Sequence, residues 1–496
     1  MLRNRCRRAG AAGGRERFGA AGALGCLILA AAALGPATLL GAERSRSRAE
    51  HAPPDEDREA LERRLGELER VVAALRAEIA RLRAAGSQAD APPASEHAIR
   101  GLERKVEALT LEILRLKAER TPIPRTGRSI NGFGPAASKI FRAKRGVVIG
   151  GYGEMLYQNF TTRKDDDTPS NAKSRADLVR AVTYVGYRAD SRFLFSTAIE
   201  IENAGGDGSP GSGDVSLEFA FIDFRATPRF AARAGLVLIP LGFLNEQHES
   251  PAFHGARRPE TEQRIIPTTW RENGAGVYGG SGPVTYRAYV VNSLDAGGFS
   301  PDEGIRGGRQ QGGQAKASNL AVTGRLDYAP RPGVLVGLSA FTGKSGQGTP
   351  GFPGGRLTMW DLHGEWVWRG LRLRGLLVRS ILSDAREISL AIDPSGSTAI
   401  GSRMKGWYLE ASWDVLERVE HTRQRLVPFC RFEDLDTQAR VPRGLSPDPA
   451  NDLTVRTCGL TYRPIPDLAI KLDAQNFDQQ AHTAVDQVNL GFGYSF

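Results

Sequence analysis

The sequence predicts an all-β fold, a sixteen-stranded antiparallel transmembrane β-barrel that follows a periplasmic α-helical coiled coil. From Gly146 onward, apolar and polar residues alternate with a period of two. The connections between the expected strands are alternately short and long, as in outer-membrane barrels. The chain also ends on an alternating segment whose last residue is Phe496. No stretch after residue 42 approaches the roughly 20 apolar residues of a spanning helix.

The first 42 residues are typical of a secretory signal peptide. Arginines precede an apolar run from Phe18 to Leu40, and Leu40-Gly41-Ala42 offers a cleavage site of small residues. A retained membrane anchor is the alternative. Cleavage would lower the net charge from +10 to +5, because the segment holds six arginines and one glutamate. That balance is too weakly basic to indicate nucleic-acid binding.

Residues 43–120 predict a coiled coil in two segments, and residues 121–145 a linker. Apolar residues recur at spacings of four and three, which is the heptad pattern of a coiled coil. Gly86 to Ser95, with two prolines, separates the segments. The segments could fold back on each other or associate between chains. The first series is Leu61, Leu65, Leu68, Val72, Leu75, Ile79 and Leu82, and the second is Ile99, Leu102, Val106, Leu109, Ile113 and Leu116.

The barrel is expected over residues 146–496. Short turns should lie on the periplasmic side and long loops outside. The longer loops are expected at 161–175, 242–271, 293–317, 383–401 and 435–451. Strands are expected near 147–160, 176–188, 191–203, 214–226, 229–241, 272–280, 284–292, 318–329, 333–344, 355–368, 370–382, 402–416, 423–434, 452–463, 467–479 and 485–496.

Two further features of the expected strands bear on assembly. The alternation through Phe492, Tyr494 and Phe496 is similar to the C-terminal assembly signal of outer-membrane barrels. Cys430 and Cys458 fall in neighbouring strands, where a disulfide or two separate thiols are both consistent with export.

One region resembles a known family. The segment Glu218 to Arg225, then Pro228 to Leu236, then Ile239 to Phe243 is similar to the core motif of the phosphate-selective porin O and porin P family. The resemblance extends over most of residues 146–496. It implies an outer-membrane homotrimer with sixteen strands per chain and a preference for anions.

The candidate site is the lumen of the barrel. The resemblance implies that the third external loop, 242–271, folds inward and narrows the pore. Its candidate constriction residues are Arg257, Arg258, Arg264 and Arg271, since rings of arginine favour anions. A solvated loop of mixed charge is the alternative, because acids are interleaved. The candidate pore-wall residues are Arg180, Arg192, Arg225, Arg233, Arg287, Arg325, Arg431 and Arg456.

The sequence contains no motif that selects an enzyme. G-x-S-x-G, H-E-x-x-H and C-x-x-C are absent, and Gly274 to Gly279 matches a dinucleotide pattern only within an expected strand. No cofactor and no metal are expected.

The leading hypothesis is a passive diffusion porin for small hydrophilic solutes, with anions such as phosphate preferred. Its expected partners are outer-membrane lipid and further copies of the chain. The alternative is an envelope tether, whose coiled coil binds peptidoglycan or a periplasmic protein. A barrel enzyme is a third hypothesis.

Overall fold

The computed structural model describes residues 67–81, 83, 100–110, 129–204, 213–227, 229–419 and 422–496. The predicted signal peptide at 1–42 lies outside these residues, as do parts of the predicted coiled coil and linker. The described residues fall into two compact units, one within 32–126 and one within 127–496. None of the described helices has the length and hydropathy to cross a membrane.

The first unit contains two described helical segments, at 67–81 and 100–110. Val72 is buried and packs against Leu68, Val106 and Leu109. Arg83 donates a hydrogen bond of 2.5 Å to the Glu103 carboxylate. The two segments therefore contact each other within one chain, on the residues that the heptad pattern selects. The complete coiled coil over 43–120 stays a prediction.

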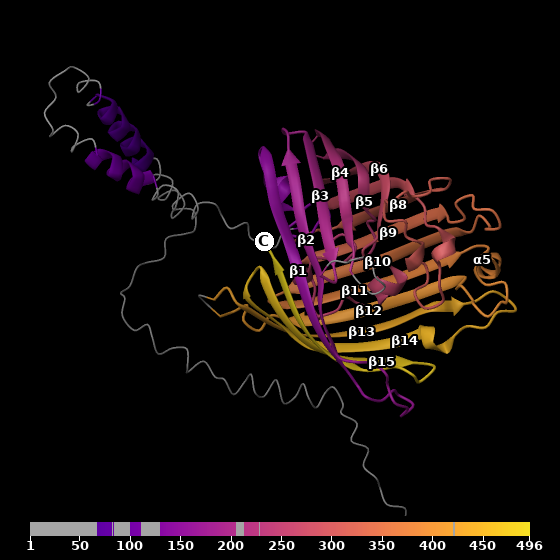
Figure 1. The fold of residues 1–496 in the computed structure, drawn as a ribbon. Coiled ribbons are helices and arrows are strands. Elements are labelled where there is room, and N and C mark those ends of the chain that lie inside the picture. The colour runs from indigo at the N-terminus through magenta and orange to yellow at the C-terminus, as the bar shows by residue number, and fades with distance from the viewer. Residues whose placement is uncertain are drawn as a thin grey trace, which may run out of the picture. The chain divides into compact units, whose positions relative to one another are not determined.

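The second unit is a barrel with short helices at its start and in its loops (Figure 1). In chain order its elements are α4 (Lys139–Arg142), β1 (Gly146–Phe160), β2 (Arg175–Arg188), β3 (Phe193–Glu202), β4 (Val215–Thr227), β5 (Phe230–Leu238), η2 (Ser250–Ala252), η3 (Thr261–Ile265), β6 (Arg271–Ser281), β7 (Val284–Asn292), η4 (Ala296–Gly298), η5 (Arg306–Gly308), β8 (Leu320–Tyr328), β9 (Val334–Lys344), β10 (Arg356–Trp368), β11 (Leu371–Leu382), α5 (Ala385–Ile392), β12 (Arg403–Trp413), β13 (Arg425–Arg440), η6 (Pro449–Asn451), β14 (Asp452–Ile465), β15 (Leu468–Gln479) and β16 (Gln487–Ser495).

The sixteen strands form one closed antiparallel barrel, in which each strand pairs with its neighbours in sequence and β1 pairs with β16. The predicted strand number and connectivity are confirmed. Closure extends to the last residue, because Phe496 and Gly151 exchange two backbone hydrogen bonds of 2.9 and 3.0 Å. A closed barrel leaves no unpaired strand edge, which a lipid environment requires.

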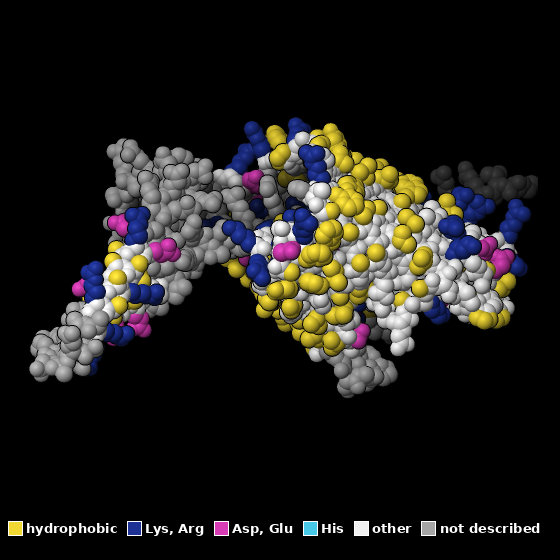
Figure 2. All heavy atoms as spheres, turned by 90° about the horizontal axis from the view of Figure 1, so that it is seen from above, with side chains coloured by type: hydrophobic (Ala, Val, Ile, Leu, Met, Phe, Trp, Pro, Cys, Tyr) yellow, Lys and Arg dark blue, Asp and Glu magenta, His cyan; other side chains and the backbone are white. Residues whose placement is uncertain are grey.

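Side chains alternate between a packed interior and an apolar exterior along the strands. In β12, Tyr408 and Glu410 are buried inside, whereas Trp407 and Leu409 between them are exposed on the outer wall. The exterior carries many exposed Val, Ile, Leu and aromatic side chains. Figure 2 shows apolar side chains over the outer wall and charged ones toward its ends. This is the side-chain distribution of a barrel that spans a membrane.

Three strand boundaries differ from the expected ones by three residues or more. β5 ends at Leu238 rather than residue 241, since Ile239 and Pro240 turn into the following loop and proline cannot donate to a sheet ladder. β12 ends at Trp413 rather than 416, where Asp414 begins a turn. β13 continues to Arg440, beyond the predicted residue 434, because its final residues pair with β12.

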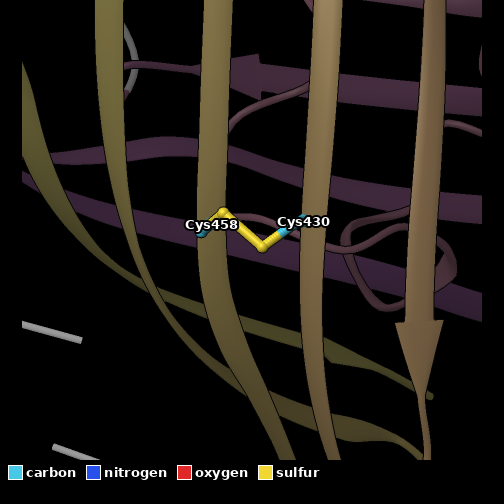
Figure 3. Close-up of a disulfide and its surroundings, with 2 residues drawn as sticks. All are labelled: Cys430 and Cys458. Atoms are coloured by element: carbon cyan, nitrogen blue, oxygen red, sulfur yellow. A yellow bond between two sulfur atoms is a disulfide. The ribbon is translucent and has the colours of Figure 1, made fainter. Parts of the chain in front are cut away.

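Cys430 and Cys458 form a disulfide between β13 and β14 (Figure 3). The two residues lie directly opposite each other in the strand register. Both alternate with buried inward residues, so the disulfide lies on the outer wall. This resolves the alternative that the sequence left open.

Candidate pore lumen

The connection between β5 and β6, residues 239–270, is largely buried inside the barrel. Two of its side chains pair with the wall near its start. The Glu246 carboxylate lies 3.3 Å from Arg287 of β7, and His248 lies 3.1 Å from Glu218 of β4. The start of the loop is therefore bound to β4 and β7, the strands on either side of the pair that the loop connects.

Further along, the same loop contacts the opposite side of the barrel. Lys471 of β15 donates to the Ser250 carbonyl at 2.7 Å, and the Thr261 amide donates to Glu433 of β13 at 3.0 Å. Tyr408 of β12 donates to Glu262 at 2.7 Å. Because its anchors lie on β4 and β7 and again on β12 to β15, the loop crosses the lumen. The predicted infolding of the third external loop is thus seen in the structure.

A second segment enters the lumen and was not expected to. Residues 132–134 and 136–138, within the predicted linker, are buried in the barrel unit. Phe133 packs against Phe219 and Phe221 of β4, at ring-centroid distances of 5.1 and 5.4 Å. The Arg233 guanidinium of β5 lies 4.7 Å from the Phe133 ring. We call residues 129–143 the N-terminal plug.

The plug and the infolded loop meet at Glu249. The Ala136 and Ala137 amides each donate to one Glu249 carboxylate oxygen, both at 2.9 Å. A side chain at Gly134 would collide with the Glu249 side chain and displace its carboxylate. On the wall side, a Cβ at Gly186 of β2 would approach within 2.8 Å of Ile140. Glycines in the wall and in the plug therefore permit this close packing.

A polar cavity of about 220 Å³ remains between the infolded loop and the wall. One side is formed by β1 to β4 and carries mainly carboxylates. The other side is formed by the loop, by β6 and by the connection 293–319, and carries guanidinium groups. The carboxylates are Glu154, Glu200, Glu202 and Asp214, joined by Arg180, and the opposing arginines are Arg257, Arg258, Arg271, Arg306 and Arg309. We call these the acidic side and the arginine side.

Arg180 is paired within the acidic side. It lies 2.9 Å from Glu200, 3.3 Å from Glu154 and 3.8 Å from Glu202. One guanidinium therefore balances only part of the negative charge of these carboxylates. The acidic side keeps a net negative character, opposite the arginine side.

Two arginines of the arginine side come from the connection between β7 and β8. Arg306 donates to the Gln263 and Thr268 carbonyls at 3.0 and 2.8 Å. Arg309 donates to the Pro267 and Thr269 carbonyls, both at 2.9 Å. These bonds brace the end of the infolded loop. Neither Arg306 nor Arg309 was predicted to line the lumen, because the residues around them in the sequence do not show which other loop they contact.

The four predicted constriction residues separate into two groups. Arg257, Arg258 and Arg271 line the cavity. Arg258 also donates to the His248 carbonyl at 3.2 Å, and Arg271 donates to Ser216 at 2.9 Å. Arg264 does not line the cavity; it pairs with Glu260 at 3.1 Å.

Charge pairing determines the state of Glu260. Burial opposes ionisation, but Arg257 and Arg264 nevertheless hold the pKa of Glu260 below its ordinary value. Arg257 lies 3.0 Å from the same carboxylate. Burial lowers the pKa of Arg309 to about 9, with nearby Arg306 and Arg271 acting in the same direction. The arginine side thus brings like charges together in a partly desolvated space.

Most predicted wall arginines point inward but are paired. Arg233 donates two hydrogen bonds to the Asp223 carboxylate, at 2.7 and 2.8 Å, and its guanidinium packs against Phe133 of the plug. The partners of Arg287 are Glu246 and Asp327, those of Arg325 are Asp327 and the Gly242 carbonyl, and those of Arg431 are Glu410 and Glu433. Arg225 is half-buried on the inward-facing side of β4. These pairs stabilise the wall and fix the loop.

Two of the predicted wall residues lie elsewhere, and their assignment is corrected. Arg192 is exposed in the turn before β3. Arg456 is exposed on the outer face of β14, where it lies 5.9 Å from the Phe432 ring. A period-two pattern does not show which polar face points inward near a strand end, where both faces can be polar.

The closed barrel, its apolar exterior and its charged interior define an outer-membrane porin-like β-barrel. No protein-family model matches the chain. A protein of Aquifex aeolicus (strain VF5), described as uncharacterized, is 38% identical over 359 residues, which is 71% of this chain and 80% of that protein. The chain belongs to the family of that protein.

Solved structures that align with the chain include the following two. The outer-membrane-expressed OmpT of Vibrio cholerae aligns with 71% of this chain and 99% of its own, with 9% identity and a TM-score of 0.44. OmpF of Salmonella typhi, in a complex with daunomycin, aligns with 71% of this chain and 98% of its own, with 12% identity and a TM-score of 0.43.

Proposed function

We propose that this protein is an outer-membrane porin, a passive diffusion channel for small hydrophilic solutes. The observation that carries the proposal is the polar cavity inside a barrel whose outer wall is apolar. Such a barrel presents its apolar face to lipid and its polar face to a water-filled passage. Passage requires no covalent step, because the width of the lumen limits solute size and its fixed charges bias entry.

The arginine side supports a preference for anions. It contributes five guanidinium groups to the cavity, whereas the acidic side holds four carboxylates around Arg180. The Nε atoms of Arg258 and Arg271 make no hydrogen bond within the described part of the chain. A fixed charge acts more strongly on a passing ion where the effective dielectric constant is low. Phosphate is the specific anion that the family resemblance suggests.

Liposome swelling and bilayer recording test this proposal together. Purified protein in liposomes should admit small sugars and small anions, and single channels should open in planar bilayers. In a potassium chloride gradient the reversal potential should have the sign of chloride preference, and excess phosphate should compete with chloride. Intact, correctly folded barrels that pass neither solutes nor ions would refute a channel function.

We also propose that the barrel assembles as a homotrimer, as the family resemblance implies. A row of four small residues and one valine crosses the outer wall from β5 to β9: Ala232, Val277, Ala288, Gly324 and Ala340, each opposite the next in register. Short side chains along this row let the wall of a second barrel approach closely. Mass measurement in detergent should give a trimer, and Ala288→Trp should dissociate it; a monomeric wild-type protein would contradict the proposal.

The N-terminal helical region is proposed to lie in the periplasm. The plug precedes β1 at the barrel end where the short turns lie, and short turns mark the periplasmic side. Peptidoglycan or a periplasmic protein remains the proposed partner of this region. A pull-down with purified peptidoglycan and the full chain tests the first of these partners.

A further inference from the structure

Six cations lie on the outer wall near the external ends of β9 to β13. They are Lys344, Arg356, Arg379, Arg403, Lys405 and Arg440, and we call them the external cation patch. On β9 to β12 they alternate with buried inward residues, and Arg440 of β13 lies opposite the outward-facing Arg403, so all six point away from the lumen. They have no part in the cavity described above.

The patch places like charges directly opposite each other. The register pairs Lys344 with Arg356, Arg379 with Lys405, and Arg403 with Arg440. Like charges at directly opposed positions destabilise a sheet. Three such pairs on one stretch of wall indicate that an anion from outside the chain offsets the repulsion.

The chain itself compensates the charge of Lys405. Lys405 lies 3.6 Å from Asp434 and directly opposite Asp436 in the register. Among the residues that the structure describes, the charged groups of the other five cations make no ion pair and no hydrogen bond. Except for Lys405, which is half-buried, these side chains are exposed.

Neighbouring tryptophans place the patch at the level of lipid headgroups. Trp360 lies directly opposite Arg379, and Trp407 follows Lys405 on the same outward face of β12. Both tryptophans are about two-fifths exposed, at 38%. Tryptophan is enriched where the hydrocarbon region meets the headgroups.

The other ends of the same strands differ. Toward the periplasmic side, β10 and β12 carry Trp366, Trp368 and Trp413 on the outer wall. Trp368 lies opposite Leu371, which in turn lies opposite Trp413. An aromatic girdle is therefore present at both levels, whereas among the described residues of β9 to β13 opposed cations on the outer wall are present only at the external level. If both leaflets required the same side chains on the outer wall, the two ends of these strands would carry similar sets of residues.

We propose that the external cation patch binds the phosphate groups of anionic lipid headgroups in the external leaflet. Guanidinium groups form paired hydrogen bonds with phosphate oxygens, and neighbouring strands lie about 4.8 Å apart. Arg379 and Lys405, or Arg403 and Arg440, can therefore reach one phosphate together. A headgroup that carries two phosphates fits the patch better than a headgroup with one, because two pairs of cations are adjacent on β11 to β13.

The test is lipid binding to the full-length protein in detergent, followed by native mass spectrometry and by thermal unfolding. The probes are lipid A with two phosphates, phosphatidylglycerol with one, and zwitterionic phosphatidylcholine. Wild-type protein should bind lipid A most tightly and phosphatidylcholine least. The variant R379Q/R403Q/R440Q should bind lipid A at least tenfold more weakly and lose the stabilisation that lipid A confers.

A matched variant controls for total charge. Arg229, Arg331 and Arg418 are exposed residues of turns on the short-turn side. The variant R229Q/R331Q/R418Q removes the same charge and should keep wild-type lipid A binding. Both variants should retain wild-type conductance, which shows that each has folded.

Three results would overturn the proposal. The first is equal binding of all three lipids to wild-type protein. The second is equal loss of lipid A binding in both variants, which would show nonspecific charge attraction. The third is full displacement of lipid A by inorganic phosphate at equal total phosphate, which would identify a site for free phosphate instead of a headgroup.

Discussion

The infolded loop at 239–270 and the N-terminal plug at 129–143 both enter the lumen, but by different means. The loop is held by ion pairs and hydrogen bonds to many strands, among them Glu246 to Arg287 and Tyr408 to Glu262. The plug is held by apolar packing of Phe133 and Ile140, by Arg233 over the Phe133 ring and by the Glu249 carboxylate. The loop is therefore a fixed part of the wall, whereas the plug depends on few contacts.

Removal of the plug has the largest expected effect. Deletion of residues 130–142 should roughly double single-channel conductance, because the buried segment occupies lumen that water and ions would then fill. The measurement is conductance in planar bilayers. Deletion of residues 113–125, which shortens the chain equally and keeps the plug, should leave conductance unchanged. Equal conductance in both deletions would show that the plug does not narrow the passage.

Removal of the disulfide should affect the stability of the barrel but not the passage of ions through it. Cys430 and Cys458 are 28 residues apart and face outward. The double variant C430S/C458S should lower the free energy of unfolding by about 3 kcal/mol, since the cross-link restricts the unfolded chain. Denaturant unfolding in detergent measures this. The conductance of the double variant should equal that of the wild-type protein. A changed conductance would indicate that the disulfide helps to set the width of the lumen.

Glu249→Ala should loosen the plug without removing it. The Ala136 and Ala137 amides would lose their acceptor, which costs about 1–3 kcal/mol for buried donors. Limited proteolysis of the folded barrel should then cut near residues 129–143 faster than in wild type. Glu417→Ala, at an exposed turn, is the matched control. Unchanged cleavage in E249A would mean that apolar packing alone holds the plug.

The smallest expected effect is that of pH on the infolded loop. The pKa of Glu260 is lowered in the folded protein, so its ion pairs with Arg257 and Arg264 are fully present above its ordinary pKa. They are lost only as the pH falls through the lowered value. The contribution of these ion pairs to ion preference should therefore be constant from pH 8 to pH 5. A marked change within that range would assign the selectivity to another titrating group.

The sequence predicted the barrel far better than it predicted the lumen. Period-two alternation depends on neighbours in the chain, so strands such as β7 were located to the residue. The infolded loop was recognised by its length and by resemblance. The plug was missed because Phe133, Ala136 and Ile140 have no regular period and pack only in the closed barrel.

The charge pattern of the cavity shows the same limit. Glu200 and Glu202 were evident on the polar face of a strand, but the residues opposite them could not be known. Arg306 and Arg309 come from a loop more than a hundred residues away in sequence. Contacts between distant segments create this site, and local patterns do not encode such contacts.

We propose that fixed charges on the two sides of the cavity filter passing ions, and paired variants test this proposal most directly. R257Q/R271Q neutralises part of the arginine side, and E202Q/D214N neutralises part of the acidic side. Reversal potentials in a potassium chloride gradient should shift toward cations in the first and toward anions in the second. Each shift should correspond to about 1 kcal/mol, or roughly fivefold in permeability ratio. Shifts in the same direction, or none in folded conducting barrels, would contradict the account.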